Sequence, residues 1–329
     1  MINQKFKIAF LGSDQIALPF LNEWRNLVPN STLSAVLTQP DRPAGRGRKL
    51  KRNPITNWAE QMQLPLRCPS KPGIEELVWL EKLKIDLLLV MAYGHILSQS
   101  MLEVAPFGCF NLHASILPAY RGASPIESAL AMGESQTGVT LMRVIRKMDA
   151  GPIADQEKVL IDSSTTATEL RNKLAQACIP LIRRNLEMIL QGRGQELNQE
   201  ERNATYCRKL TKKDGILDFS LSAEQLACRV RAFCEWPGSV IICKDEPIKV
   251  ADAVSLEKET TMRTGEVGRD PSGDLLIGTS SGILKIGRLQ KPGGKMMAAK
   301  EFLLGYDLPI GAILPTKTGS PLLSYSGRF

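Results

Sequence analysis

Histidine is almost absent from this chain, since only His95 and His113 among its 329 residues carry an imidazole. Long apolar runs are absent too, so we expect no membrane-spanning segment. The first seven residues lead directly into a strand pattern without a signal sequence, which predicts a cytoplasmic protein. The seven cysteines form no CxxC pair, and we expect reduced thiols that mostly pack in the interior.

Cofactor motifs are also missing. The first apolar run is followed by Gly12-Ser13-Asp14, whose single glycine leaves no GxGxxG for a dinucleotide. The sequence contains no GxxxxGK[ST] phosphate loop and no His, Cys or carboxylate cluster with metal-ligand spacing. These absences argue against NAD and against a metal, and they make a nucleotide-dependent oxidoreductase the weakest alternative.

The first half of the chain alternates apolar runs with helical patterns. Strands are predicted at residues 6–11, 33–37, 64–67, 85–91, 109–113 and 139–145, and helices at 16–27, 54–63, 74–83, 124–132 and 165–191. Continuous apolar strands separated by amphipathic helices are typical of a parallel sheet covered on both faces. We therefore predict an α/β, Rossmann-like catalytic domain with a mostly parallel sheet at residues 1–191.

The second half of the chain has a different pattern, with a polar segment followed by many short strands. Residues 192–208 are polar and nearly free of large aliphatic side chains, as expected of an interdomain linker. After a helical pattern at 223–233, short strand patterns follow at 239–243, 248–253, 275–277 and 283–286, separated by Gly and Pro. This predicts a smaller OB-like β-barrel domain at residues 209–329.

The rare His113 lies in the string Asn-Leu-His-Ala-Ser-Ile-Leu-Pro-Ala-Tyr-Arg-Gly, which begins at Asn111. Asn111 and His113 project from one side of a strand end, where ligands of open α/β sheets bind. Asp149 follows the next apolar run, so we expect all three on neighbouring strand ends. An amide can stabilise an oxyanion, an imidazole can exchange a proton near neutral pH, and a carboxylate can orient the imidazole or a water. Without a GxSxG elbow or a nearby cysteine, this pattern favours acyl transfer to a nucleophile supplied by a substrate.

Purely structural roles stay open for these residues. Asn111 could cap a turn, His113 could fill a gap in the core, and Asp149 could begin a loop. His95 is more typical of packing or solvent exposure than of catalysis.

Positive charge is concentrated in two places within a net charge of +8. Between Thr38 and Arg52, six cations stand against one acid, a pattern typical of a solvated loop or of a surface that binds a polyanion. The second cluster lies in the β-rich half and suits backbone phosphates: Lys285, Arg288, Lys291, Lys295 and Lys300.

The string NLHASILPAYRGASPI, with Asp149 following in MDAG, resembles the signature of the 10-formyltetrahydrofolate-dependent formyltransferases. The resemblance extends through TQPDRPAGRG (38–47), MAYGHILS (91–98), KLTKKDGILDF (209–219) and RAFCEWPGS (231–239). It implies an enzyme that transfers the formyl group of 10-formyltetrahydrofolate to the α-amino group of methionyl initiator tRNA, for translation initiation. A monomer that needs no metal, NAD or membrane is expected.

The resemblance also implies roles for individual residues. Asn111, His113 and Asp149 take the catalytic positions. The folate contacts are expected at Ser115, Ile116, Leu117 and Pro118, and at Met91, Tyr93, Ile96 and Leu97. The tRNA contacts are expected at Arg42, Arg46, Arg48 and Lys49, with Arg46 as the discriminating side chain. The chain departs from the family after the first strand, where Gly12-Ser13-Asp14 replaces the frequent Gly-Thr-Pro. The resemblance therefore does not predict the details of the pocket for the methionyl side chain.

Two other functions remain as alternatives. The first keeps the chemistry and changes the acceptor to a sugar nucleotide, glycinamide ribonucleotide or water. The second is a tRNA-binding protein without catalysis. The two basic clusters favour tRNA over a small acceptor, and the intact trio favours an enzyme over a binding protein.

Overall fold

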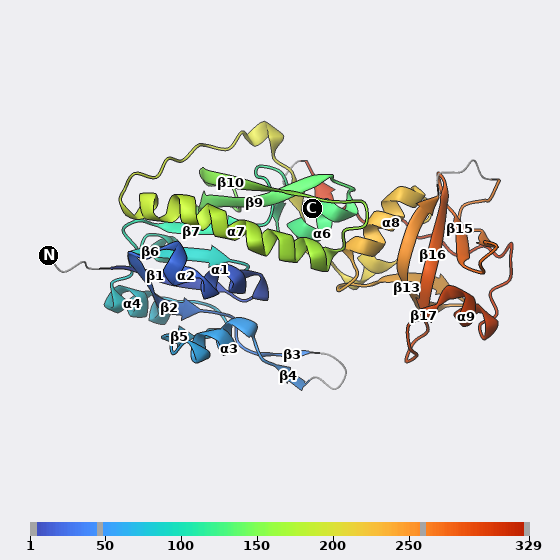
Figure 1. Cartoon of the computed structure of the whole chain (residues 1–329), viewed down its shortest axis with the longest axis horizontal. Coiled ribbons are helices and arrows are strands. Elements are labelled where there is room, and N and C mark those ends of the chain that lie inside the picture. Colours follow the sequence, from blue (N-terminus) through green and yellow to red (C-terminus); the bar gives the residue numbers. More distant parts are fainter. Residues whose placement is uncertain (1–4, 45–48, 257–260, 326–329) are drawn as a thin grey trace. The chain divides into compact units, whose positions relative to one another are not determined.

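The computed structural model describes residues 5–44, 49–256 and 261–325 (Figure 1). Its contacts divide the chain into two compact units. The first consists of Met1–Arg121, Gln136–Leu160 and Arg171–Thr205, and the second of Gly122–Ser135, Ile161–Leu170 and Tyr206–Phe329. Two short segments of the predicted catalytic domain thus pack with the C-terminal unit. No helix within the described ranges is long and apolar enough to cross a membrane.

The first unit is built on a seven-stranded sheet with the strand order β10-β9-β7-β6-β1-β2-β5. Five strands are parallel: β1 (Phe6–Gly12), β2 (Ser31–Leu37), β5 (Leu66–Arg67), β6 (Leu87–Met91) and β7 (Cys109–His113). Side chains of both faces, such as Leu88 and Leu89 of β6, are fully buried. Burial on both faces produces the continuous apolar runs in the sequence and confirms the predicted mostly parallel, Rossmann-like sheet.

One edge of this sheet departs from the parallel pattern. β9 (Gln136–Arg143) is antiparallel to β7, and β10 (Ile153–Leu160) is antiparallel to β9. β10 was not predicted from the sequence because four of its eight residues, Asp155 to Lys158, are polar and none of the eight is fully buried. A strand at the edge of a sheet needs no apolar run to be recruited, since its backbone hydrogen bonds hold it.

The helices of the first unit mostly begin and end where predicted. They are α3 (Pro54–Gln61), α4 (Ile74–Leu83) and α7 (Ala167–Leu190), whose first residues belong to the second unit. The short helix α5 (Gln99–Leu102) was not predicted. The predicted helix at 16–27 is instead a 3-10 turn (Gln15–Ala17) followed by α1 (Leu18–Asn22) and α2 (Trp24–Leu27). The apolar spacing predicted its buried side chains, Phe20 and Trp24 among them, but spacing does not reveal that Glu23 leaves helical geometry.

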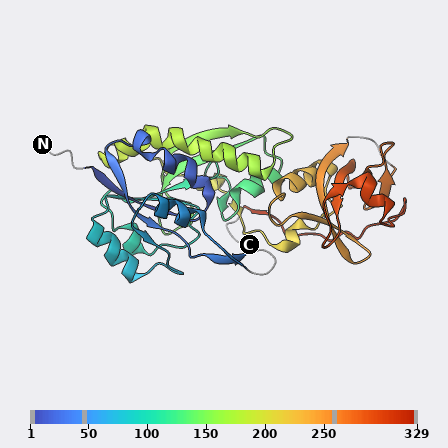
Figure 2. The ribbon, with the colours of Figure 1, turned by 60° about the horizontal axis from the view of Figure 1, so that its bottom comes forward.

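The second unit contains an antiparallel sheet with the order β12-β13-β16-β15-β14, with β17 added to β16. Its strands are β12 (Ser239–Cys243), β13 (Glu246–Leu256), β14 (Val267–Arg269), β15 (Leu275–Gly278), β16 (Ile283–Gln290) and β17 (Met297–Ala298). The long strands β13 and β16 run side by side (Figure 1 and Figure 2). Helices α8 (Ala223–Ala232) and α9 (Ala299–Leu304) contribute Leu226 and Phe302 to the core of this sheet.

The remaining elements are short. The second unit also holds α6 (Pro125–Ala131) and the strand pair β11 (Tyr206–Cys207) and β18 (Leu323–Ser324), and β8 is Arg121–Gly122. The β-rich character of the C-terminal half confirms the prediction of a second, smaller β domain after an α/β domain.

Candidate active site

Asn111 and His113 are two residues apart on β7, so their side chains project from the same face of the sheet. His113 is 6% exposed and Asn111 is half-buried. The side-chain amide of Asn111 makes no hydrogen bond to any residue in the described part of the chain. Its N–H groups are therefore available to a ligand.

The imidazole of His113 is oriented by the backbone. Its Nε2 lies 2.9 Å from the carbonyl oxygen of Tyr120. Because a carbonyl oxygen can only accept, Nε2 carries the hydrogen, and Nδ1 is the ring nitrogen that can gain or lose a proton. Tyr120 has a left-handed backbone with φ of 59°, a conformation that a bulky residue keeps only where its surroundings hold it.

Asp149 faces the other ring nitrogen of His113. Its Oδ2 lies 3.8 Å from Nδ1, which is within the range of an ion pair and too long for a hydrogen bond. Like Tyr120, Asp149 has a left-handed backbone, with φ of 48°. Both groups that flank the imidazole thus come from residues in a rarely adopted conformation, which is common at functional sites.

The route of the chain to Asp149 differs from the prediction. In the antiparallel β7–β9 pair, Thr140 lies opposite His113 and Arg143 lies opposite Phe110. The end of β9 is therefore level with the start of β7, and the following segment must return along the sheet to bring Asp149 to His113. The predicted arrangement on neighbouring strand ends was wrong, because an apolar run does not reveal the direction of its strand.

The predicted folate turn, residues 115–118, directly follows β7 and is tied to the neighbouring strands. Thr140 Oγ1 donates to the carbonyl of Ser115 (2.6 Å) and accepts from the N–H of Leu117 (3.1 Å). The side-chain amide of Gln156 donates to the carbonyl of Leu117 (2.8 Å). These contacts hold the turn in place beside His113.

The second predicted folate segment, residues 91–97, begins at the last residue of β6. Tyr93 is buried, and its carbonyl accepts a hydrogen bond from Gln39 Nε2 (2.7 Å), whereas Ile96 is 88% exposed. A Cβ at Gly12 would lie 2.6 Å from the carbonyl oxygen of Met91. The single glycine after the first strand therefore serves close packing against this segment and needs no nucleotide to explain it.

His95, in the same segment, has an unsatisfied nitrogen. Its Nε2 is buried and has no hydrogen-bond partner within the described ranges. Burial, and after it the positive charge of Arg42, lowers the pKa of His95 below its usual value. The ring packs edge-on against Tyr93, with 5.0 Å between centroids. A neutral imidazole with an unpaired nitrogen is a polar group that a ligand could satisfy.

Two of the predicted tRNA-binding residues, Arg42 and Lys49, lie on a hairpin where the sequence predicted a loop. Its strands β3 (Arg42–Ala44) and β4 (Lys49–Lys51) are antiparallel, with Arg42 opposite Lys51 and Ala44 opposite Lys49. Arg42 is exposed. Arg46 and Arg48 lie outside the described residues.

The cations predicted for the second unit are not equivalent. Lys285 forms ion pairs with Asp270 (2.6 Å) and Asp274 (3.0 Å), and Arg288 lies 3.7 Å from Asp252. Through its hydrogen bond, Lys285 holds the pKa of Asp270 well below its usual value. Part of the positive charge in this cluster is therefore offset by neighbouring aspartates.

Two residues that contact this site, Arg121 and Gln199, were not predicted from the sequence. The Arg121 side chain is fully buried, and the Gln199 amide donates to the backbone carbonyl of Asp149 (2.9 Å). Gln199 lies in the segment predicted as a linker, where a polar residue carries no signal of its own. Arg121 lies within the string that contains His113, and that position was its only signal.

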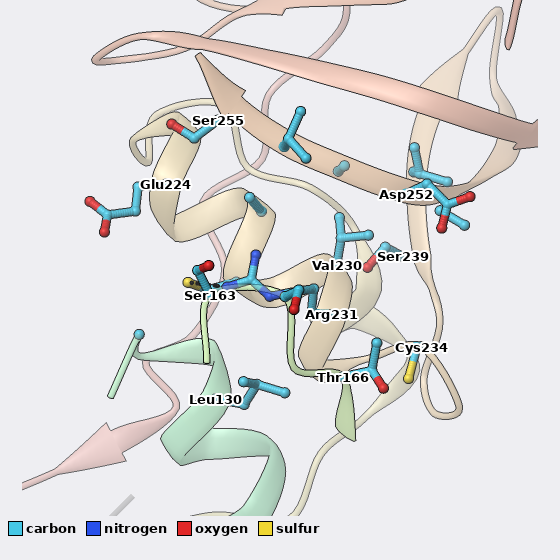
Figure 3. A pocket seen from close by; sticks show the side chains of 18 of the residues that line it. Leu130, Ser163, Thr166, Glu224, Val230, Arg231, Cys234, Ser239, Asp252 and Ser255 are labelled. Atoms are coloured by element: carbon cyan, nitrogen blue, oxygen red, sulfur yellow. Dashed lines mark hydrogen bonds between the residues drawn. The ribbon is translucent and has the colours of Figure 1, made fainter. Parts of the chain in front are cut away.

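A cavity of about 1360 Å³ lies within the second unit, and none of the predicted site residues lines it (Figure 3). Arg231 lies in it and donates a hydrogen bond to the sulfur of Cys228 (3.2 Å), and its Nε has no partner among the described residues. Acidic side chains, Glu224 and Asp252 among them, also line this cavity. Within the described ranges no group of His, Cys, Asp and Glu side chains is arranged as a metal site.

Two family models match the chain. The model described as "Formyl transferase" matches residues 6–183, and the model described as "Formyl transferase, C-terminal domain" matches residues 209–307. The first match covers more than half of the chain and contains Asn111, His113 and Asp149.

Individual proteins match over nearly the whole chain. A methionyl-tRNA formyltransferase of Halorhodospira halophila is 39% identical over 93% of this chain and 98% of its own length. One from Moorella thermoacetica is 35% identical over 94% of this chain and 99% of its own length. Among solved structures, an N-formyltransferase of Helicobacter canadensis in complex with folinic acid and dTDP-3-aminofucose has a TM-score of 0.65 at 18% identity, covering 87% of this chain and 100% of that one. HypX of Aquifex aeolicus in complex with tetrahydrofolic acid has a TM-score of 0.56 at 16% identity, covering 90% of this chain and 46% of that one.

Proposed function

The chain belongs to the formyl transferase family, and on this premise we propose that it transfers the formyl group of 10-formyltetrahydrofolate to the α-amino group of methionyl initiator tRNA. Relatives named methionyl-tRNA formyltransferase that match both halves of the chain support this acceptor. The product is N-formylmethionyl-tRNA, which is used in translation initiation.

The observation that carries the proposed chemistry is the arrangement around His113. The Asn111 amide, which has no hydrogen-bond partner among the described residues, shares one face of β7 with the imidazole, and a carboxylate lies 3.8 Å from Nδ1 of that imidazole. The described site thus combines an oxyanion donor, a proton carrier and a group that stabilises positive charge on the carrier.

In the proposed mechanism the substrates supply both reacting atoms. The folate presents a formyl carbon bound to N10, and the methionyl α-amine attacks it. A free α-amine has a pKa of about 7.7, so a useful fraction is neutral and nucleophilic near pH 7.5. As the new C–N bond forms, negative charge grows on the formyl oxygen, to which the Asn111 amide donates a hydrogen bond. One such donor contributes about 3 kcal/mol to the transition state.

His113 moves the proton that the attacking amine must lose. Because Nε2 donates to the Tyr120 carbonyl, Nδ1 accepts the proton and then returns it to N10 as the bond between N10 and the formyl carbon breaks. Asp149 stabilises the positive charge on the ring during the transfer. In the complete reaction, the C–N bond between the formyl carbon and N10 breaks, a C–N bond between the formyl carbon and the α-amine forms, and one proton moves from the amine to N10.

The donor set of the site fits a folate. Asn111 and the buried Nε2 of His95 are polar groups that no described residue satisfies, as recognition of a polar heterocycle requires. We assign residues 115–118 and 91–97 to folate binding because hydrogen bonds hold both segments in place beside the site, with Met91, Tyr93, Ile96 and Leu97 in the second. No metal takes part in the proposed mechanism.

The tRNA would bind through charge. The exposed Arg42 and the cationic sequence around it, which includes Arg46, Arg48 and Lys49, suit the phosphates of an acceptor stem. The C-terminal unit adds further cations, of which Lys291, Lys295 and Lys300 make no ion pair within the described ranges. These two basic clusters favour tRNA over a sugar nucleotide as the acceptor.

The proposal is tested by incubating purified protein with 10-formyltetrahydrofolate and methionyl initiator tRNA, with methionyl elongator tRNA and a dTDP-amino sugar as competing acceptors. We expect N-formylmethionine on the initiator tRNA in preference to both other products. Formylation of the sugar, or release of formate without an acceptor, would replace the proposed function.

A further inference from the structure

The buried guanidinium of Arg121 is linked by hydrogen bonds to the segment that carries Asp149. Arg121 is 0% exposed. It donates from Nε (3.1 Å) and Nη2 (2.8 Å) to Oε1 of Gln199, and from Nη1 to both carboxylate oxygens of Glu201 (3.1 Å each). A charge this deeply buried is tolerated only when its hydrogen bonds are made, so the position of Gln199 is strongly determined.

The other end of the Gln199 amide holds the segment that carries Asp149. Its Nε2 donates to the carbonyl of Asp149 (2.9 Å) and to the carbonyl of Gly151 (2.7 Å). The acceptor oxygen and both amide hydrogens are therefore in use. Only glutamine combines these groups at this length, since glutamate has no hydrogen to donate and asparagine is one methylene shorter.

The contact matters because Asp149 is strained. Its left-handed φ of 48° is unfavourable for a residue with a side chain and persists only when neighbours impose it. The hydrogen bond from Gln199 acts on the carbonyl of this same residue. Without it the backbone could relax, and the carboxylate would turn away from Nδ1 of His113.

The same short segment also holds the residue that orients His113. Thr205 accepts from the N–H of Arg121 with its carbonyl (2.8 Å), and its Oγ1 accepts from the N–H of Tyr120 (2.8 Å). Tyr120 in turn accepts from Nε2 of His113. Residues 199–205 therefore support the imidazole and the carboxylate together.

From these contacts we infer that Gln199, presented by Arg121, is a positioning residue that aims the carboxylate of Asp149 at Nδ1 of His113. The inference deepens the proposed function and rests on it. It gives a segment with the composition of an interdomain linker an indirect part in the proton transfer, since Gln199 acts through Asp149.

The test compares Gln199→Leu and Gln199→Glu with the wild type. Leucine removes every hydrogen bond, and glutamate keeps the acceptor for Arg121 while losing both donors to the Asp149 segment. We expect both variants to lower kcat about tenfold to a hundredfold, with KM for each substrate within about twofold. The matched control is Glu200→Gln, because Glu200 is exposed and, of the residues that the structure describes, its carboxylate contacts only Arg202 and Asn203.

A double-mutant cycle separates positioning from general destabilisation. If Gln199 acts through the carboxylate, Gln199→Leu should have little further effect on kcat in an Asp149→Asn background. An equal loss in both backgrounds, or an unchanged kcat in Gln199→Glu, would overturn the inference.

A spectroscopic readout does not depend on turnover. With only two histidines in the chain, ¹⁵N-histidine labelling resolves the ring nitrogens of His113 and His95. The Nδ1 signal of His113 should move in both Gln199 variants in the same direction as in Asp149→Asn, whereas His95 should not move. An unmoved His113 signal would contradict the inference even if the wild type failed to formylate tRNA, so the two proposals fail separately.

Discussion

The site around His113 and the hairpin β3–β4 hold their polar groups in opposite ways. His113 is almost fully buried and has a protein group at each ring nitrogen, whereas Arg42 is exposed and makes no ion pair with the described residues. Proton transfer needs atoms held within a few tenths of an ångström, while attraction of a polyanion needs only charge of the right sign. We therefore expect substitutions at the site to act on kcat and substitutions on the hairpin to act on tRNA affinity.

The largest effect is expected from His113→Ala. The variant loses the proton carrier, so kcat should fall about 10³-fold. Binding of tetrahydrofolate, followed by fluorescence titration, should stay within about twofold, and the melting curve should confirm that the variant folds. A variant that retains full turnover would remove His113 from the mechanism.

Asn111→Ala should have the next largest effect. The variant loses a donor to the formyl oxygen, which corresponds to a fall in kcat of about 10²-fold, with KM for the tRNA unchanged. Steady-state kinetics with both substrates varied would check this. If KM rose instead while kcat stayed the same, Asn111 would be a binding group and the contrast with the hairpin would weaken.

Arg42→Ala tests the other side of the comparison. At low salt KM for the tRNA should rise about fivefold with kcat nearly unchanged, and the slope of log affinity against log salt should fall by about 1. The matched control is Arg52→Ala, because Arg52 follows β4 and is already paired with Glu60. Equal effects of the two substitutions would show that local pairing does not decide which cations bind tRNA.

The smallest effects are expected in the C-terminal unit. Lys291→Ala should weaken tRNA binding about twofold, and Lys285→Ala by less, because Asp270 and Asp274 already neutralise that ammonium group. In Lys285→Ala the pKa of Asp270 should rise toward its ordinary value, which NMR titration of the carboxyl group can follow. A larger loss of affinity for Lys285→Ala would mean that tRNA displaces the two carboxylates.

Helices and strands were predictable from the sequence where a local pattern of apolar residues marks them. The strand at 109–113 and the helix at 74–83 were predicted with the bounds that the structure shows, since each has a strong apolar pattern and a clear start and end. β10 was not predictable from apolar spacing because four consecutive polar residues interrupt it and it lies at an edge of the sheet. The hairpin β3–β4 was equally hidden, because two strands of three residues held by a few backbone hydrogen bonds leave little trace in composition.

For the candidate site, the sequence predicted which side chains take part but not how they are arranged in space. Asn111 and His113 are two residues apart in one string, and strand periodicity places both on one face. Asp149 was chosen by order along the chain and by resemblance, and the geometric reason offered for it was wrong. Gln199 could not be chosen, because its contacts reach 48 to 78 residues back along the chain and no local pattern encodes them.

By itself the sequence determined which groups are present: one rare imidazole on a strand beside an amide, two basic clusters, and an α/β half followed by a β-rich half. Local spacing and hydrophobic burial are enough for that. Only the tertiary structure decided the direction of β9, the 3.8 Å distance between Asp149 and Nδ1 of His113, the ion pairs of Lys285, and the hydrogen bonds that link Arg121 and Gln199 to the Asp149 segment. These depend on hydrogen bonds and ion pairs between distant residues, which form only once the chain has folded.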